Sequence, residues 1–176
     1  MGDSLAPAFL PIETDRLLLR ELTVADAPFI LALLNDPDWL RHIGDRNVRS
    51  LADAETFIVD RLMAHYRERG FGFWLAVSKT NGAATGLCGL IKREGLDDID
   101  VGYAFLPAYR GLGLAFEAAE AAVAYARDRL GVKRLVAITG EENIASARLL
   151  ERLGLRYEGL KQVKPYGVSR LFAIEF

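Results

Sequence analysis

The stretch that decides the fold runs from Ile99 to Ala115 and reads IDVGYAFLPAYRGLGLA. Its first seven residues alternate bulky side chains with Asp100, Gly102 and Ala104, which is the period of a strand with one bulky and one nearly bare face. A glycine-rich turn follows this strand. The alanine-rich segment behind the turn, which ends at Gly131, indicates a long helix.

The sequence on both sides of this stretch predicts a mixed α/β sheet. The apolar run 135–138 is typical of a strand buried on both faces, so strand, helix and strand form a right-handed crossover with parallel pairing. Further strands are expected at 16–22, 71–78, 85–92, 156–162 and 168–175, and further helices at 28–34, 50–70 and 143–154, with an irregular stretch at 35–47. The sum is a seven-stranded mixed sheet with about four helices.

Composition excludes several classes of protein. A chain of 176 residues fits one domain, and 22 Lys+Arg against 24 Asp+Glu give no cationic surface for nucleic acid or an anionic membrane. The single cysteine, Cys88, excludes an intramolecular disulfide, and two histidines are too few for a thiolate-imidazole zinc site. No targeting or membrane-spanning segment is evident. We therefore expect a cytoplasmic protein without a metal, as a monomer or homodimer.

The turn 110–115 has the properties of an anion site. Glycines between a strand and a helix let an anion approach the N–H groups that the helix end leaves unpaired. The turn is not a P-loop, since no Gly-Lys dipeptide occurs in the chain, and Phe116 replaces the third glycine of the dinucleotide fingerprint. The alternative is that Gly111 and Gly113 only shape a tight turn.

Arg110, Gly113 and Ala115 fit a phosphate-binding signature: Arg or Gln, two residues, Gly, one residue, then Gly or Ala. On these residues the sequence resembles the GNAT superfamily of acyl-CoA-dependent N-acyltransferases. The segments 13–20, 101–103 and 142–148 make it most similar to the RimJ/RimL type, the branch named for ribosomal-protein N-terminal acetylation. The resemblance implies an N-terminal extension at 1–11 and an acyltransferase domain at 12–176.

The resemblance also implies where the donor, acetyl-CoA, binds. Two central parallel strands splay apart, and the acyl-CoA lies between them. Backbone groups of Ala104, Phe105 and Leu106 then pair with the pantetheine, to which Asn143 also hydrogen-bonds. The pyrophosphate is held by the turn residues Arg110, Gly111, Leu112, Gly113, Leu114 and Ala115.

Two residues are candidates for proton transfer. Asp100 is the expected base for the incoming amine; the alternative is that it ends a turn in solvent. Ser146 is implied to lie near the sulfur and to protonate the departing thiolate, although Asn143 and Ser146 also suit plain helix capping. Many members of the superfamily use a tyrosine as this acid, but Leu150 stands at its position.

The long connection at 36–47 is the expected recognition loop for the acceptor, a protein N-terminus or a small amine, with Trp39 and His42 as binding residues. Both side chains could instead pack on the core, while His65 and Cys88 are expected to be structural. Three other functions stay open: a non-catalytic CoA-binding domain, a transferase for a longer donor such as succinyl-CoA, and a nucleotide-dependent oxidoreductase.

Overall fold

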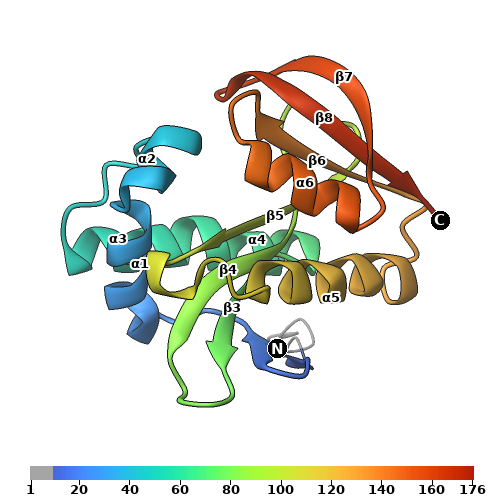
Figure 1. Cartoon of the computed structure of the whole chain (residues 1–176). Helices are drawn as coiled ribbons and strands as arrows, with labels where there is room; N and C mark the ends of the chain where they lie inside the picture. Colours follow the sequence, from blue (N-terminus) through green and yellow to red (C-terminus); the bar gives the residue numbers. More distant parts are fainter. Residues whose placement is uncertain (1–9) are drawn as a thin grey trace, which may run out of the picture.

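An eight-stranded mixed sheet forms the centre of the computed structural model, which describes residues 10–176 (Figure 1). Its order is β1-β2-β3-β4-β5-β6-β8-β7, and every neighbouring pair is antiparallel except β5 and β6. The strands are β1 (Ile12–Glu13), β2 (Leu17–Arg20), β3 (Phe73–Ser78), β4 (Ala84–Ile91), β5 (Ile99–Phe105), β6 (Arg134–Gly140), β7 (Arg156–Val163) and β8 (Gly167–Glu175).

The predicted mixed α/β sheet is confirmed, with one strand more than expected. The additional strand is β1, two residues that pair with Leu18 and Leu19 at the sheet edge. Such a short strand has no periodicity that a sequence pattern could reveal. Most of the expected extension 1–11 lies outside the described residues.

The described residues hold six α-helical segments, where about four were expected. They are α1 (Ala27–Leu34), α2 (Pro37–His42), α3 (Leu51–Phe57), α4 (Ala64–Arg69), α5 (Leu114–Asp128) and α6 (Ile144–Arg152). The segment predicted as one helix, 50–70, is divided into α3 and α4 by the π-helical η2 (Ile58–Met63). Single-turn 3₁₀ segments, η1 (Val24–Asp26) and η3 (Pro107–Tyr109), precede α1 and follow β5. None of the helices in residues 10–176 is long and apolar enough to cross a membrane.

The prediction of an irregular stretch at 35–47 is wrong in its first half, which contains α2. The Asp36 side chain caps this helix by accepting a hydrogen bond from the Trp39 N–H at 3.3 Å, and Pro37 occupies its first turn. Proline both ends a preceding helix and begins a following one, because its missing N–H is unneeded in a first turn. Asp36-Pro37 is thus a boundary between two helices.

The two faces of the sheet carry separate cores, as the alternation in β5 predicts. Val101 and Phe105 belong to the core beneath α5 and α6, together with Ala118 and Ala122 of α5. Ala104, on the bare face, packs against the core formed by α1, α3 and η2. Figure 1 shows α5 and α6 on one side of the strands and α4 behind them.

The two parallel strands separate along their length, as expected. Strands β5 and β6 share a register only at Ile99↔Leu135 and Asp100↔Val136. Beyond those pairs no ladder joins them, although β5 continues to Phe105 and β6 to Gly140. The gap lies at the carboxyl ends of parallel strands, where ligands of open α/β sheets usually bind.

Candidate active site

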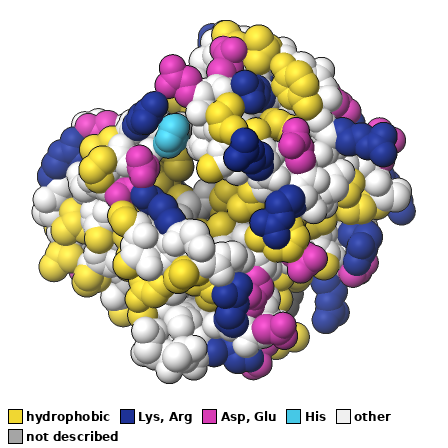
Figure 2. Space-filling model, in the orientation of Figure 1, with side chains coloured by type: hydrophobic (Ala, Val, Ile, Leu, Met, Phe, Trp, Pro, Cys, Tyr) yellow, Lys and Arg dark blue, Asp and Glu magenta, His cyan; other side chains and the backbone are white. Residues whose placement is uncertain are grey.

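A cavity of about 1370 Å³ opens where β5 and β6 separate. Its wall includes the exposed edge of β5, the end of β6, the glycine turn before α5, the start of α6, and side chains of α2 and η2. Figure 2 shows the hollow near the middle of one face, with acidic, basic and histidine side chains around it. The cavity is therefore shared by segments far apart in sequence.

The glycine turn forms the end of the cavity nearest α5. Gly111 and Gly113 have positive φ angles of 72° and 79°, which suit glycine, and Gly113 is the N-cap residue of α5. Apart from Gly111 and its two chain neighbours, no heavy atom of the described residues lies within 4 Å of where a Cβ of Gly111 would stand, so the turn is open to a ligand. With the unpaired N–H groups of the first turn of α5, this geometry suits a phosphate.

Arg16 holds this turn in place, a role that the sequence analysis missed. Its guanidinium donates to the Leu112 carbonyl at 2.8 Å and forms an ion pair with Glu117 of α5 at 2.7 Å. Glu117 also accepts from the Thr14 hydroxyl at 2.6 Å. In the sequence, segment 13–20 indicated only a resemblance to the family. In the structure its residue Arg16 contacts the turn and α5 from outside the cavity.

The Arg110 guanidinium makes three contacts with protein groups. It donates to the Phe105 carbonyl at 2.9 Å and forms ion pairs with Asp36 and Asp38, each at 2.5 Å. It therefore ties the end of β5 to α2. Phosphate contact by this side chain stays a prediction; Arg110 lines the cavity beside the turn, and three of its five N–H groups already have partners.

The edge of β5 that faces the gap offers backbone groups to a ligand. Part of the backbone of Ala104, Phe105 and Leu106 already has partners. Ala104 and Phe105 pair with β4, the Leu106 N–H donates to the Thr85 carbonyl, and the Phe105 carbonyl accepts from Arg110. The residues Gly102 to Phe105 line the cavity without a strand neighbour on the β6 side. An extended ligand could therefore pair with this edge as a strand would.

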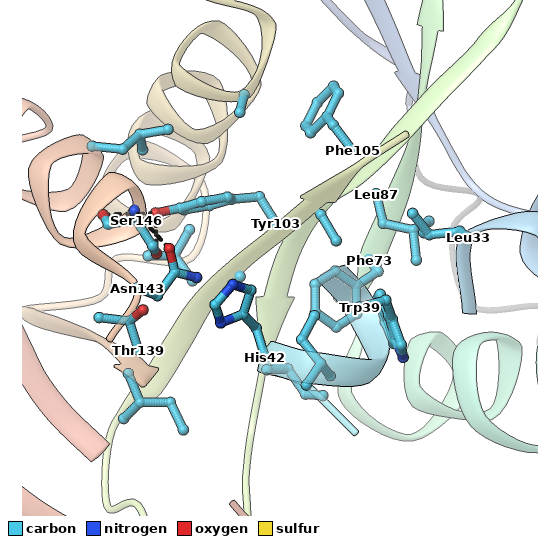
Figure 3. Close-up of a pocket in the computed structure, with 18 of the residues that line it drawn as sticks. Leu33, Trp39, His42, Phe73, Leu87, Tyr103, Phe105, Thr139, Asn143 and Ser146 are labelled. Carbon is cyan, nitrogen blue, oxygen red and sulfur yellow. Dashed lines mark hydrogen bonds between the residues drawn. The ribbon is translucent and has the colours of Figure 1, made fainter. Parts of the chain in front are cut away.

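Ser146 lies in the cavity wall within a small hydrogen-bonded group (Figure 3). The Asn143 side chain caps α6 by accepting from the Ser146 N–H at 3.2 Å. The Ser146 hydroxyl lies 2.9 Å from the Tyr103 hydroxyl, which also donates to the Ser146 carbonyl at 3.2 Å. Burial raises the pKa of Tyr103, so its hydroxyl stays protonated at neutral pH. Asn143 and Ser146 therefore form the cap of α6 and also line the cavity.

Tyr103 escaped the sequence analysis because strand alternation placed it on the bulky, core-facing side of β5. That placement is correct, since Tyr103 packs against the core beneath α5 and α6. However, its hydroxyl extends past the core to Ser146 and the cavity. Leu150, at the position of the usual tyrosine, is buried.

Asp100 lies outside the cavity wall, contrary to the expectation that it faces the acyl group. It is only 1% exposed, so the alternative of a solvated turn residue is also wrong. Its carboxylate is paired with the Nε of Arg93, and Arg93 in turn lines the cavity. Burial raises the pKa of Asp100 to about 6 against the opposing effect of Arg93. Its contact with the cavity is therefore through Arg93.

Trp39 and His42 both line the cavity from α2. The Trp39 indole packs against the core formed by α1 and α3 and donates to the Gly44 carbonyl at 3.1 Å. Figure 3 shows the His42 ring projecting from α2 toward Asn143 and Thr139. Of the two, His42 presents the freer polar group.

The remaining histidine and the cysteine have structural environments. His65 contacts the Phe71 carbonyl with Nδ1 at 2.7 Å, and its Nε2 accepts from the Lys92 N–H at 3.3 Å. Cys88 is fully buried, which raises the pKa of its thiol and keeps it protonated. Within residues 10–176 no cluster of His, Cys, Asp and Glu side chains has the make-up of a metal site.

Comparison with known proteins agrees with this geometry. The model of the acetyltransferase (GNAT) domain matches residues 16–156. The N-acetyltransferase YoaA of Bacillus subtilis (strain 168), itself uncharacterized, is 30% identical over 153 residues, which cover 85% of this chain and 84% of YoaA. YnaD of the same organism, also an uncharacterized N-acetyltransferase, is 28% identical and covers 89% of both chains.

Solved structures share the fold. An acetyltransferase from Agrobacterium tumefaciens str. C58 superposes with a TM-score of 0.82 at 22% identity and covers all of both chains. RimL, a ribosomal L7/L12 α-N-protein acetyltransferase in complex with coenzyme A, superposes with a TM-score of 0.80 at 17% identity. The superposition covers 95% of this chain and 98% of RimL. From the extent of the domain match and the shared architecture, the chain belongs to the GNAT acetyltransferase family.

Proposed function

We propose that this protein transfers an acetyl group from acetyl-CoA to an amine. The observation that carries the proposal is the cavity between β5 and β6, which has an anion-binding turn at one end and the hydroxyls of Tyr103 and Ser146 in its wall. The match to the acetyltransferase (GNAT) domain supports the same reaction class. RimL, which shares the fold, is a ribosomal L7/L12 α-N-protein acetyltransferase, and this supports a protein N-terminus as one class of acceptor.

The shape of the cavity supports the proposed donor-binding residues. The N–H groups of Gly111 to Ala115 would hold the pyrophosphate, and the open edge of β5 would pair with the pantetheine arm. The Asn143 carboxamide has its oxygen committed to capping α6, so its NH₂ is the part left to hydrogen-bond that arm. When bound, the thioester supplies an activated acyl carbon for direct attack by the amine.

Ser146 is the proposed general acid. Its hydroxyl is suited to give a proton to the departing thiolate. The Tyr103 proton, which is within reach of both the Ser146 carbonyl and the Ser146 hydroxyl, can then turn from the carbonyl to the hydroxyl oxygen. Tyr103 therefore acts through Ser146 as a positioning residue. The acceptor would enter from α2, where Trp39 supplies an apolar surface and His42 a polar group.

The base stays a prediction centred on Asp100, and because the Arg93 guanidinium between it and the cavity cannot accept a proton, the amine proton would have to reach the carboxylate past Arg93. A free amine holds its proton at neutral pH, since its pKa is about 8 for an α-amino group and about 10.4 for lysine. A carboxylate with a pKa of about 6 is better matched to this proton transfer than an ordinary aspartate. If Asp100 is the base, only its ionised form is active, so kcat/KM rises with pH through about 6.

The variant Asp100→Asn tests this role. We expect kcat/KM to fall by about 100-fold and the midpoint near pH 6 to disappear from its pH profile, because general-base catalysis typically contributes 10²–10⁴. Asp97→Asn, three residues away at an exposed position, is the matched control and should leave the profile unchanged. An Asp100→Asn enzyme with wild-type rates and an unaltered profile would remove Asp100 from the mechanism.

The donor is tested by thermal unfolding with acetyl-CoA, succinyl-CoA, free CoA, NAD and ATP in parallel. A ligand at about 100 times its Kd adds about 2.7 kcal/mol to the free energy of unfolding, which for a domain of this size raises Tm by roughly 5–10 °C. We expect the shift with CoA compounds alone. A shift with NAD or ATP, and none with any CoA compound, would contradict the proposed function.

A further inference from the structure

Three polar side chains from distant segments meet in the cavity wall, away from the glycine turn. Arg46 follows α2, Arg93 follows β4, and Tyr166 lies in the turn between β7 and β8. The Tyr166 hydroxyl accepts from Arg46 at 2.9 Å and from Arg93 at 2.6 Å. Both guanidinium groups also lie over the Tyr166 ring, at 5.6 and 4.9 Å from its centroid. We call these residues the Arg46–Tyr166–Arg93 cluster.

The cluster carries a net positive charge. Asp100 is paired with Arg93 and offsets one of the two guanidinium charges. Arg46 has no carboxylate partner among the described residues; its hydrogen bond is to Tyr166. The two guanidinium groups repel each other because both donate to the same hydroxyl, and a bound anion would reduce this repulsion.

Every hydrogen-bonding group that the cluster has left over is a donor. A tyrosine hydroxyl has one proton and two lone pairs, and here two guanidinium groups occupy the lone pairs. The Tyr166 proton and the remaining N–H groups of Arg46 and Arg93 are then left to point at a ligand. An ionised carboxylate only accepts hydrogen bonds and is planar, which matches a guanidinium.

The cluster lies at the other end of β5 from the proposed pyrophosphate site. Arg93 contacts Asp100, whereas Arg110 contacts Phe105, and five residues of extended strand span about 16 Å. Tyr103, which reaches Ser146, is three residues from Asp100, or about 10 Å along the strand. A Cβ at Gly102 would stand 3.7 Å from an Arg93 nitrogen, so Arg93 borders the bare face of the gap.

We propose that the Arg46–Tyr166–Arg93 cluster binds a carboxylate of a substrate, placed several bonds from the reacting atoms. Two sources present this chemistry: an acceptor amine that bears a carboxylate, such as a peptide with an acidic side chain, or the far end of a dicarboxylic acyl chain such as succinyl. The inference rests on the proposed acyl transfer, because it assigns the substrate of that same cavity.

The test measures equilibrium binding by calorimetry in two arms. The acceptor arm titrates the C-terminally amidated tripeptides Ala-Glu-Ala-NH₂ and Ala-Gln-Ala-NH₂, in which the Glu side chain is the only carboxylate, into protein with and without saturating CoA. The donor arm compares succinyl-CoA with acetyl-CoA. Each arm uses the wild type, Arg46→Met, Arg46→Lys and Tyr166→Phe. Arg127→Met is the matched control, since it removes the same charge from an exposed position at the end of α5, outside the cavity wall.

In one of the two arms, we expect the wild type to prefer the carboxylate probe by at least about tenfold. Arg46→Met should reduce that preference to less than about twofold, Arg46→Lys and Tyr166→Phe should retain part of it, and Arg127→Met all of it. The arm that responds identifies the source of the carboxylate. Circular dichroism checks that the variants are folded.

The proposal is overturned if neither arm shows a preference in the wild type, if no carboxylate probe binds, or if Arg46→Met keeps the wild-type preference. Failure of the proposed function gives a different result. In that case acetyl-CoA and CoA themselves do not bind, while the tripeptide titration without CoA still reports on the cluster.

Discussion

Gly113→Asp is expected to weaken CoA binding by at least about 100-fold while the protein remains folded. The new carboxylate would stand at the N-terminus of α5, where it competes with the pyrophosphate for the first-turn N–H groups and repels its charge. It would also lie near Arg16, because a Cβ at this position is 3.3 Å from an Arg16 nitrogen. Calorimetric titration with CoA measures the effect.

Gly113→Ala separates charge from backbone strain in this experiment. Gly113 has a φ of 79°, and any residue with a Cβ is strained there by about 1–2 kcal/mol. The alanine variant should therefore lose some stability and up to about tenfold in affinity. If the aspartate variant binds CoA as tightly as the alanine variant does, the turn does not hold the phosphates.

Ser146→Ala is expected to lower kcat by about 100-fold with little change in the Kd of CoA. The alanine cannot protonate the departing thiolate, and general-acid catalysis typically contributes 10²–10⁴. We place the effect at the low end because a thiolate is a fair leaving group. Cofactor affinity should stay within threefold, since the cap of α6 uses the Ser146 backbone N–H, which alanine retains. Steady-state kinetics measures kcat, and titration of the same preparation with CoA measures the Kd.

Tyr103→Phe shows whether the tyrosine acts through Ser146. Alone, it should lower kcat by about tenfold, because Ser146 loses its hydrogen-bond partner but keeps its proton. When Tyr103→Phe is combined with Ser146→Ala, kcat should fall no further than in Ser146→Ala alone, since the effects of residues that act as one unit are not additive. A double variant whose losses multiply would mean that the two hydroxyls contribute separately.

The main elements of the fold could be predicted because their signals are local. Alternation from Ile99 to Phe105 identifies β5 and assigns its two faces, and the apolar run in β6 identifies a strand buried on both sides. The Asn81-Gly82 turn fixes the hairpin of β3 and β4. By contrast, α2 was missed because Asp36-Pro37 is both a stop and a start signal.

The cavity residues that the sequence predicted lie in segments with a local signal: the glycine turn, the N-terminus of α6 and the long connection 36–47. Gly111 and Gly113 were found because positive φ needs glycine, and the glycines show in the sequence. Contacts between side chains from distant segments leave no local pattern. Arg16 and Glu117 are 101 residues apart, and Tyr103 and Ser146 are 43 apart, so composition and spacing cannot pair them.

Asp100 illustrates this limit most clearly. Its position in the alternation correctly gave the bare face of β5, and that face does border the gap. The sequence could not show that Arg93 would lie between the carboxylate and the cavity. Because Arg93 lies between them, Asp100 does not line the cavity as predicted but is the buried partner of an ion pair.

The separation of β5 from β6 makes the sheet discontinuous. Only two residue pairs join the five strands on one side to the three on the other. A donor whose arm hydrogen-bonds along this seam would take the place of the missing ladder and become part of the secondary structure. Amides on the open edge of β5 would then exchange with deuterium freely in the unliganded protein and become protected on binding. The substrate would thus complete the scaffold that binds it.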